Sequence, residues 1–169
     1  MRTRGWDDGV ALSRYGAAID GLVSPRLVGL NNARTHEDGV MTQLVGTFHT
    51  MSWDEEQYDA APGHPKFTHA RVTHELHGAI EGEASICYLL AYRPDHRASF
   101  VGFAMVTGKV GEKSGSFVMQ DIGTFENGVA KGRWTILPGL GSGGLHSIRG
   151  DGHFAAGAAG ASYLLDVTL

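Results

Sequence analysis

Hydrophobic and polar residues alternate along most of the chain after Gln43, in short runs separated by turn-forming residues. Alternation with a period of two is typical of β-strands that bury one face. Gly, Pro, Asn or Asp bound the runs, and Asn127-Gly128 is the pair most typical of a two-residue hairpin. The pattern predicts eight strands, at 44–52, 68–77, 80–92, 97–109, 115–124, 129–137, 151–156 and 161–169.

The short connections predict that strands adjacent in sequence pair antiparallel, in a barrel or a sandwich. Four glycines lie inside predicted strands: Gly82, Gly102, Gly123 and Gly132. They favour the barrel, because closing a sheet needs sharp local bends. We therefore expect an all-β protein, a closed antiparallel eight-stranded barrel with no helix after residue 60.

Alternation also predicts which side chains point inward. The inward sets include polar and aromatic residues, namely His74, Tyr88, Asp121, Trp134 and Tyr163. Strand 97–109 is apolar on both faces, so its outer face is expected to meet the N-terminal segment or a second subunit. Cys87, Glu81 and Glu83 are expected outside, although an inverted or bulged strand would turn the glutamates inward.

The first forty residues follow a different pattern. Residues 10–19 are a candidate helix, weakened by glycines, and residues 29–41 are predicted to be a linker. The chain is thus divided into an extension at 1–42 and a barrel domain at 43–169. We interpret the extension as a lid over the barrel, with a subunit-bridging arm or a disordered leader as the alternatives.

Composition and charge exclude several classes of protein. The 169 residues carry a net charge of −4 with Lys and Arg scattered singly, whereas nucleic-acid binders carry a basic stripe. No apolar run reaches the ~18 residues of a membrane helix, and no secretory signal follows Met1. A single cysteine excludes an internal disulfide and fits a reducing compartment. We therefore expect a cytoplasmic protein without nucleic-acid or membrane partners.

Four segments carry a family resemblance: GTFHTMSWDEEQY (46–58), VTHELHGAIEGEASICYLLAY (72–92), ASFVGFAMVTGKVGEKSGSFVMQDIGTF (98–125) and WTILPGLGSGGLHSIRGDGHF (134–154). They resemble a bacterial family of small proteins of unknown function that is grouped with the allene oxide cyclase-like, calycin-like β-barrels. The resemblance covers roughly residues 43–169 and implies the same barrel. That wider class includes cyclases, isomerases and non-catalytic binders. Asp121 stands where the family pattern has a histidine.

An apolar interior with a few titratable groups favours a barrel that holds a small hydrophobic molecule. The catalytic candidates are His74, Asp121 and Tyr88, because a buried aspartate near a histidine or tyrosine can move a proton. The ligand-binding candidates are Trp53, Phe117, Met119, Trp134 and Tyr163. We interpret the protein as a cyclase or isomerase that needs no cofactor or metal, with a non-catalytic carrier and a filled structural or oligomerising barrel as alternatives. A second copy of the chain is a further candidate partner.

Two motifs, a pair of histidines and a glycine-rich segment, match the letters of known binding motifs but lack the secondary structure that those motifs need. His74 and His77 are an odd number of residues apart, so a strand sends them to opposite faces and they cannot share a metal ion. Residues 139–144 spell G-x-G-x-x-G, but a dinucleotide site needs a helix that opens at the third glycine. The residues that follow are poor helix formers, so we interpret the segment as a loop.

We expect the glycine-rich segment 139–144 to bind no nucleotide, because no helix N-terminus is available to hold the phosphates. Calorimetric titration with NAD, FAD and ATP should give no heat beyond dilution. Micromolar binding of any of the three would contradict the prediction.

Overall fold

The structure is a computed structural model that describes residues 35–36, 39–59, 62 and 64–169. This part of the chain is all β, without a helix. Its ten strands are β1 (Thr35–His36), β2 (Gly39–Asp59), β3 (Lys66–Gly78), β4 (Ile80–Tyr92), β5 (Ala98–Val110), β6 (Lys113–Glu126), β7 (Val129–Ile136), β8 (Ser142–Gly143), β9 (Arg149–Gly157) and β10 (Gly160–Thr168).

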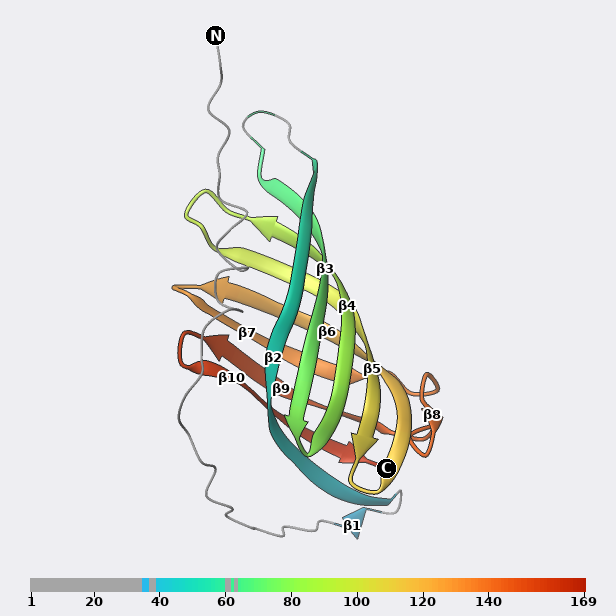
Figure 1. The fold of residues 1–169 in the computed structure, drawn as a ribbon. Helices are drawn as coiled ribbons and strands as arrows, with labels where there is room; N and C mark the ends of the chain where they lie inside the picture. The colour runs from blue at the N-terminus through green and yellow to red at the C-terminus, as the bar shows by residue number, and fades with distance from the viewer. Residues whose placement is uncertain (1–34, 37–38, 60–61, 63) are drawn as a thin grey trace.

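Eight of these strands form one closed ring, seen in Figure 1. Neighbouring strands are antiparallel in the order β2-β10-β9-β7-β6-β5-β4-β3, and the pairing of β2 with β3 closes the ring. Outside the ring, β1 pairs antiparallel with the start of β2, and β8 pairs with β6. The predicted eight-stranded antiparallel barrel is confirmed, and β3 to β7, β9 and β10 begin and end within a few residues of the predicted strands. The two-residue strand β8 was not predicted.

The residues of β2 that point into the barrel change from even-numbered to odd-numbered halfway along the strand. Its register with β3 shifts between Thr50 and Ser52, so Met51 is the extra residue of a β-bulge. Leu44 and Phe48 are buried before the bulge, whereas Trp53 and Glu55 are the partly buried residues after it. The prediction that the first strand ends near Trp53 is wrong, because β2 continues to Asp59 and the bulge turns Trp53 inward.

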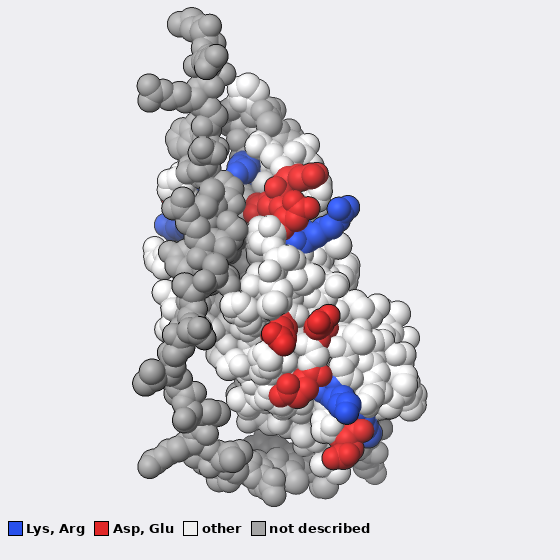
Figure 2. All heavy atoms as spheres, viewed as in Figure 1, with Lys and Arg blue, Asp and Glu red and all other residues white. Residues whose placement is uncertain are grey.

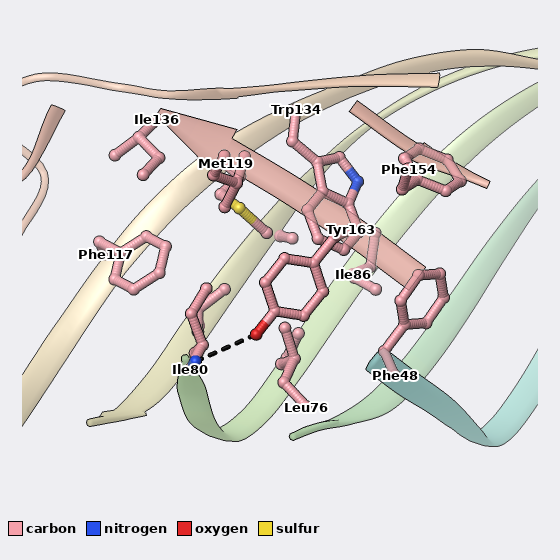
Figure 3. Packing of buried hydrophobic residues seen from close by; sticks show 14 of the residues in the cluster. Phe48, Leu76, Ile80, Ile86, Phe117, Met119, Trp134, Ile136, Phe154 and Tyr163 are labelled. Atoms are coloured by element: carbon pink, nitrogen blue, oxygen red, sulfur yellow. Dashed lines mark hydrogen bonds between the residues drawn. The ribbon is translucent and has the colours of Figure 1, made fainter. Parts of the chain in front are cut away.

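The buried interior has an aliphatic end and an aromatic end. The β7–β9 connection contributes Leu145 and Ile148, which are buried near the start of β6, where β8 pairs. Toward the other end of the strands the interior is aromatic, and the ring of Phe48 contacts those of Trp134 and Phe154. Figure 3 shows Phe117 and Ile136 at one side of this cluster and the aromatic group at the other.

Three inward-facing glycines give the aromatic rings their space. A Cβ on Gly123 would lie 2.5 Å from Cζ of Phe100, and one on Gly132 would lie 2.6 Å from Cε1 of Phe154. A Cβ on Gly102 would lie 2.7 Å from Cδ1 of Tyr88. Real Cβ atoms do not approach so closely, so each glycine leaves a gap that a neighbouring ring fills.

Most charged side chains lie on the outside of the barrel, and Asp121 is the buried exception among the described residues. Glu81 and Glu83 are exposed, which confirms the expected outward face of β4. Glu75 lies directly opposite Glu83, and His77 is within 3.6 Å of the carboxylates of Glu75 and Glu81. On the face seen in Figure 2, basic side chains lie singly or beside acidic ones. Across the described residues, no group of His, Cys, Asp and Glu is arranged to hold a metal ion.

Strand pairing begins before the predicted barrel. The linker predicted at 29–41 is wrong for its described residues, because Thr35–His36 pairs with the start of β2 at Gly39. The predicted helix at 10–19 lies outside the described residues, and the lid and the boundary at residue 42 stay predictions. In the part of the chain that is described, no helix is long and apolar enough to cross a membrane.

We expect Gly123→Ala to lower the free energy of unfolding by about 1–3 kcal/mol, because the methyl group would overlap the Phe100 ring and the Lys131 carbonyl oxygen. Gly157→Ala is the matched control, because its nearest neighbour would be Cγ2 of Val129 at 3.4 Å. The control should change stability by less than about 0.5 kcal/mol. Urea unfolding measures both, and equal losses would contradict the packing role of Gly123.

Candidate functional site

Asp121 is the centre of a buried hydrogen-bonded group. Its side chain is on the inner face of β6 and its residue is only 1% exposed. Oδ2 accepts hydrogen bonds from the Tyr88 hydroxyl at 2.5 Å and from Nε1 of Trp134 at 3.0 Å. Three strands therefore converge on one carboxylate oxygen.

The register of the barrel explains how Tyr88 reaches Asp121. Tyr88 on β4, Gly102 on β5, Asp121 on β6 and Trp134 on β7 lie in one row around the ring. Gly102 has no side chain, so the Tyr88 ring crosses β5 through the gap and meets the carboxylate two strands away. The glycine in β5 is thus a requirement of the site as well as of the barrel's curvature.

The second oxygen of Asp121 has no partner. Among the described residues, Oδ1 of Asp121 is the one buried side-chain nitrogen or oxygen without a hydrogen bond. Burial raises the pKa of Asp121 from 3.8 to about 6, and the hydrogen bonds from Tyr88 and Trp134 lower it in part. Burial and the nearby carboxylate also raise the pKa of Tyr88. The carboxyl can therefore gain or lose a proton near neutral pH while Tyr88 stays protonated.

Trp53 covers this group and is itself held by Glu55. The Trp53 ring stacks on Tyr88 with ring centroids 6.1 Å apart. Nε1 of Trp53 donates to one oxygen of Glu55 at 2.7 Å, and the other oxygen accepts from Thr68 at 2.6 Å and Tyr92 at 2.7 Å. Burial and the hydrogen bond to Glu55 raise the pKa of the Tyr92 hydroxyl. Glu55 thus fixes Trp53 above Tyr88.

His74 is buried but lies apart from Asp121. Its Nδ1 is 3.1 Å from the Thr50 hydroxyl, and its ring is 4.9 Å from that of Phe48. The Phe48 ring lies 5.4 Å from that of Trp134, so an aromatic ring stands between the histidine and the partners of Asp121. Burial lowers the pKa of His74 from 6.5 to about 4, so the imidazole is neutral at pH 7.

The remaining predicted ligand-binding residues belong to the packed core. Tyr163 donates its hydroxyl to the His77 carbonyl at 3.2 Å. The same hydroxyl accepts from the Ile80 amide at 3.0 Å, the hydrogen bond drawn in Figure 3. Phe117 and Met119 are each 1% exposed. Of the predicted site residues, the structure brings together Tyr88, Asp121, Trp134 and Trp53. Sequence reasoning missed Thr68 and Tyr92. Glu55 follows Trp53 by two residues in the W-x-E part of the family resemblance, which marked it as structural and gave it no role in the site.

Comparison with known proteins places the chain in a family. Residues 44–167 match the family described as "Protein of unknown function (DUF3224)". The chain belongs to the DUF3224 family. A crystal structure of a DUF3224 protein of unknown function from Shewanella oneidensis MR-1 is similar at 21% identity and a TM-score of 0.65. The match covers 76% of this chain and 98% of that protein.

At this identity the likeness to the Shewanella protein shows the fold alone. No curated protein matches the chain. The resemblance to a family of unknown function is therefore confirmed, whereas the grouping of DUF3224 with allene oxide cyclase-like barrels stays a prediction. Any chemistry of this DUF3224 chain has to be argued from its own residues.

Asp121 and His74 give this DUF3224 barrel opposite dependences on pH. With the pKa of Asp121 raised to about 6, its stabilising contribution is complete below about pH 4 and is lost as the pH rises through 6. With the pKa of His74 lowered to about 4, its contribution is complete above about pH 6.5 and is lost as the pH falls through 4. Between about pH 4 and 6 the two groups change the free energy of unfolding in opposite directions, each by about 1.4 kcal/mol per pH unit.

We expect single substitutions to reveal the two slopes. On acidification from about pH 6 to 4, Asp121→Asn should lose about 3 kcal/mol of unfolding free energy relative to wild type, because wild type gains stability from Asp121 there. His74→Gln should gain a similar amount relative to wild type. Urea unfolding across this range measures both differences. Parallel profiles for all three proteins would contradict the opposed titrations.

Proposed function

We propose that the barrel binds a small, largely apolar molecule that presents a hydrogen-bond donor to Asp121. The unpartnered Oδ1 of this buried carboxyl carries the proposal. A buried acceptor without a donor costs the folded protein free energy, and buried polar groups are otherwise almost always paired. A ligand with an N–H or O–H group would recover that free energy on binding.

The surroundings of Asp121 favour a ligand with a flat or flexible apolar body. The rings of Tyr88 and Phe100 pack edge to face at 5.4 Å, and those of Trp134 and Phe154 stack at 5.0 Å. Aromatic faces bind apolar and cationic groups well. The polar side chains that are buried in the described residues are those of Thr68, His74 and Asp121.

The charge of the site favours a protonated amine as the donor. None of the buried polar residues in the described barrel is cationic, because His74 is neutral at pH 7. The ionised form of Asp121 therefore has neutral hydrogen-bond donors as partners and no counter-ion. A ligand ammonium group would neutralise the carboxylate and lie against electron-rich rings, as in sites that bind amines.

The route to Asp121 passes Trp53 in this proposal. Trp53 is partly buried and covers Tyr88, whose hydroxyl is bonded to Asp121. Rotation of the indole about its side-chain bonds, with loss of its hydrogen bond to Glu55, opens the way to the carboxylate. Re-formation of the hydrogen bond to Glu55 then holds Trp53 in its closed position.

We expect octylamine to raise the melting temperature of the protein at pH 7 more than octanol, and octanoate to raise it least, because a second carboxylate would repel Asp121. Asp121→Asn should abolish the preference for the amine. Asp166→Asn is the matched control, because Asp166 is an exposed aspartate on β10 bonded to Gln43. Equal shifts by the three compounds would contradict the proposal. Native mass spectrometry of protein purified from its own host would identify a molecule that co-purifies.

A second candidate function is proton transfer, as in a cofactor-free isomerase or cyclase. It is favoured by the pKa of Asp121 near 6, because a group that titrates near neutral pH serves as both acid and base. Catalysis predicts that the co-purified molecule, incubated with the protein in D₂O, takes up deuterium at carbon, and that Asp121→Asn stops the uptake. A carrier predicts binding without deuterium uptake.

A further inference from the structure

The outer face of the barrel carries a continuous apolar patch over β4, β5 and β6. Five large hydrophobic side chains point outward there, namely Leu89 (54% exposed), Val101 (39%), Phe103 (54%), Met105 (47%) and Ile122 (52%). The strand register makes them neighbours. Leu89, Val101 and Ile122 form one row across β4, β5 and β6, and Phe103 and Met105 are the β5 residues of the next two rows. We call these five residues the β5 patch.

The β5 patch is free of charge. Its remaining positions in the same three rows are Ser85, Cys87, Val118 and Gln120, so all nine residues are uncharged. With five large side chains about half exposed, the apolar area is on the order of 400 Å², the size at which an exposed patch marks an interaction surface. The interior site does not explain this face, because its side chains point away from Asp121.

We propose that the β5 patch is the interface of a weak symmetric homodimer with its two-fold axis along β5. Such an axis puts β4 of one copy over β6 of the other, so Leu89 meets Ile122 of the partner subunit and Phe103 meets its own counterpart. A two-fold axis across the strands would instead put Leu89 over the polar Ser85. Of these two arrangements, the axis along β5 alone gives each of the five large side chains a large apolar partner, although it also puts Ser85 over Val118.

The nearest charges flank the β5 patch. Beyond Cys87 and Gln120, the central row continues to Arg71 on β3 and Thr135 on β7. The row of Leu89 continues to His69, which is beside Glu56, and to Arg133, which is paired with Asp151. In the closed eight-strand ring β3 and β7 each lie two strands from β5, so these charges stay at the sides of the interface and do not enter it.

The area predicts a dimer of modest affinity. Two patches bury about 800 Å² of apolar surface, and the polar edges bring the total to about 1,000–1,200 Å², the low end for specific interfaces. We therefore expect the protein to change from mostly monomer to mostly dimer as its concentration rises from about 1 µM to about 1 mM. Sedimentation velocity of the full chain over this range tests the expectation, and a monomer throughout would overturn the proposal.

Two matched substitutions test the location of the interface. Phe103→Lys places two like charges at the axis and should weaken the dimer at least about 100-fold. Val45→Lys is the control, because Val45 is a 55% exposed side chain on β2, outside the β5 patch, and Phe103 is 54% exposed. The control should dimerise as wild type does. Equal weakening in both, or none in Phe103→Lys, would overturn the proposal, provided that circular dichroism shows both variants folded.

The axis itself is tested by charge exchange. Leu89→Lys and Ile122→Glu should each weaken the dimer, whereas the chain with both substitutions should recover it, because each lysine then faces a glutamate of the partner subunit. The two sites lie two strands apart in one copy, so the pairing forms between copies. A doubly substituted chain that stays monomeric would overturn the axis along β5.

Cys87, the single cysteine of the chain, reports on the same face because it lies beside Phe103. Its rate of reaction with a maleimide should fall as wild-type protein is concentrated and stay constant in Phe103→Lys. Protection of Cys87 that does not depend on concentration would mean that another part of the same chain covers the patch, and that result would overturn the dimer.

Discussion

The space inside an eight-stranded ring is the constraint on which the rest of this protein depends. A barrel of this size is just wide enough for its inward side chains, so a large ring on one strand needs a missing side chain on the next. The rings of Tyr88, Phe100 and Phe154 fit because the residues beside them are Gly102, Gly123 and Gly132, which have no side chains. The polar group at Asp121 exists because one of these gaps lets a tyrosine cross a strand.

The bulge at Met51 is the second determinant of the site. Without it, β2 would keep even-numbered residues inward to its end, and Trp53 and Glu55 would face solvent. With it, the same strand contributes Phe48 to the aromatic interior and Trp53 to its cover. Bulges are common beside functional sites for this reason, since one extra residue re-aims every side chain that follows.

Much of this architecture could be predicted from the sequence, because a strand that buries one face alternates hydrophobic and polar residues with a period of two. That period predicted the strands, the barrel and the inward positions of His74, Tyr88, Asp121, Trp134 and Tyr163, all of which are buried. It could not predict the contact between Tyr88 and Asp121, because alternation fixes faces and not the rows that join strands 33 residues apart. It also failed at Trp53, because a bulge leaves no mark in a pattern that assumes unbroken alternation.

The closure of the ring has a consequence for how the chain folds during synthesis. β2 pairs on one side with β3, the next strand, and on the other with β10, where the side chains of Gln43 and Asp166 bond across 123 residues. One edge of β2 therefore stays without its partner until the strand at Gly160–Thr168 has left the ribosome. During that interval the growing chain is an open, curved sheet with two bare edges, and such edges invite pairing with other chains. Chaperone demand and inclusion-body formation should therefore depend on how soon β10 arrives, more than on the stability of the finished barrel.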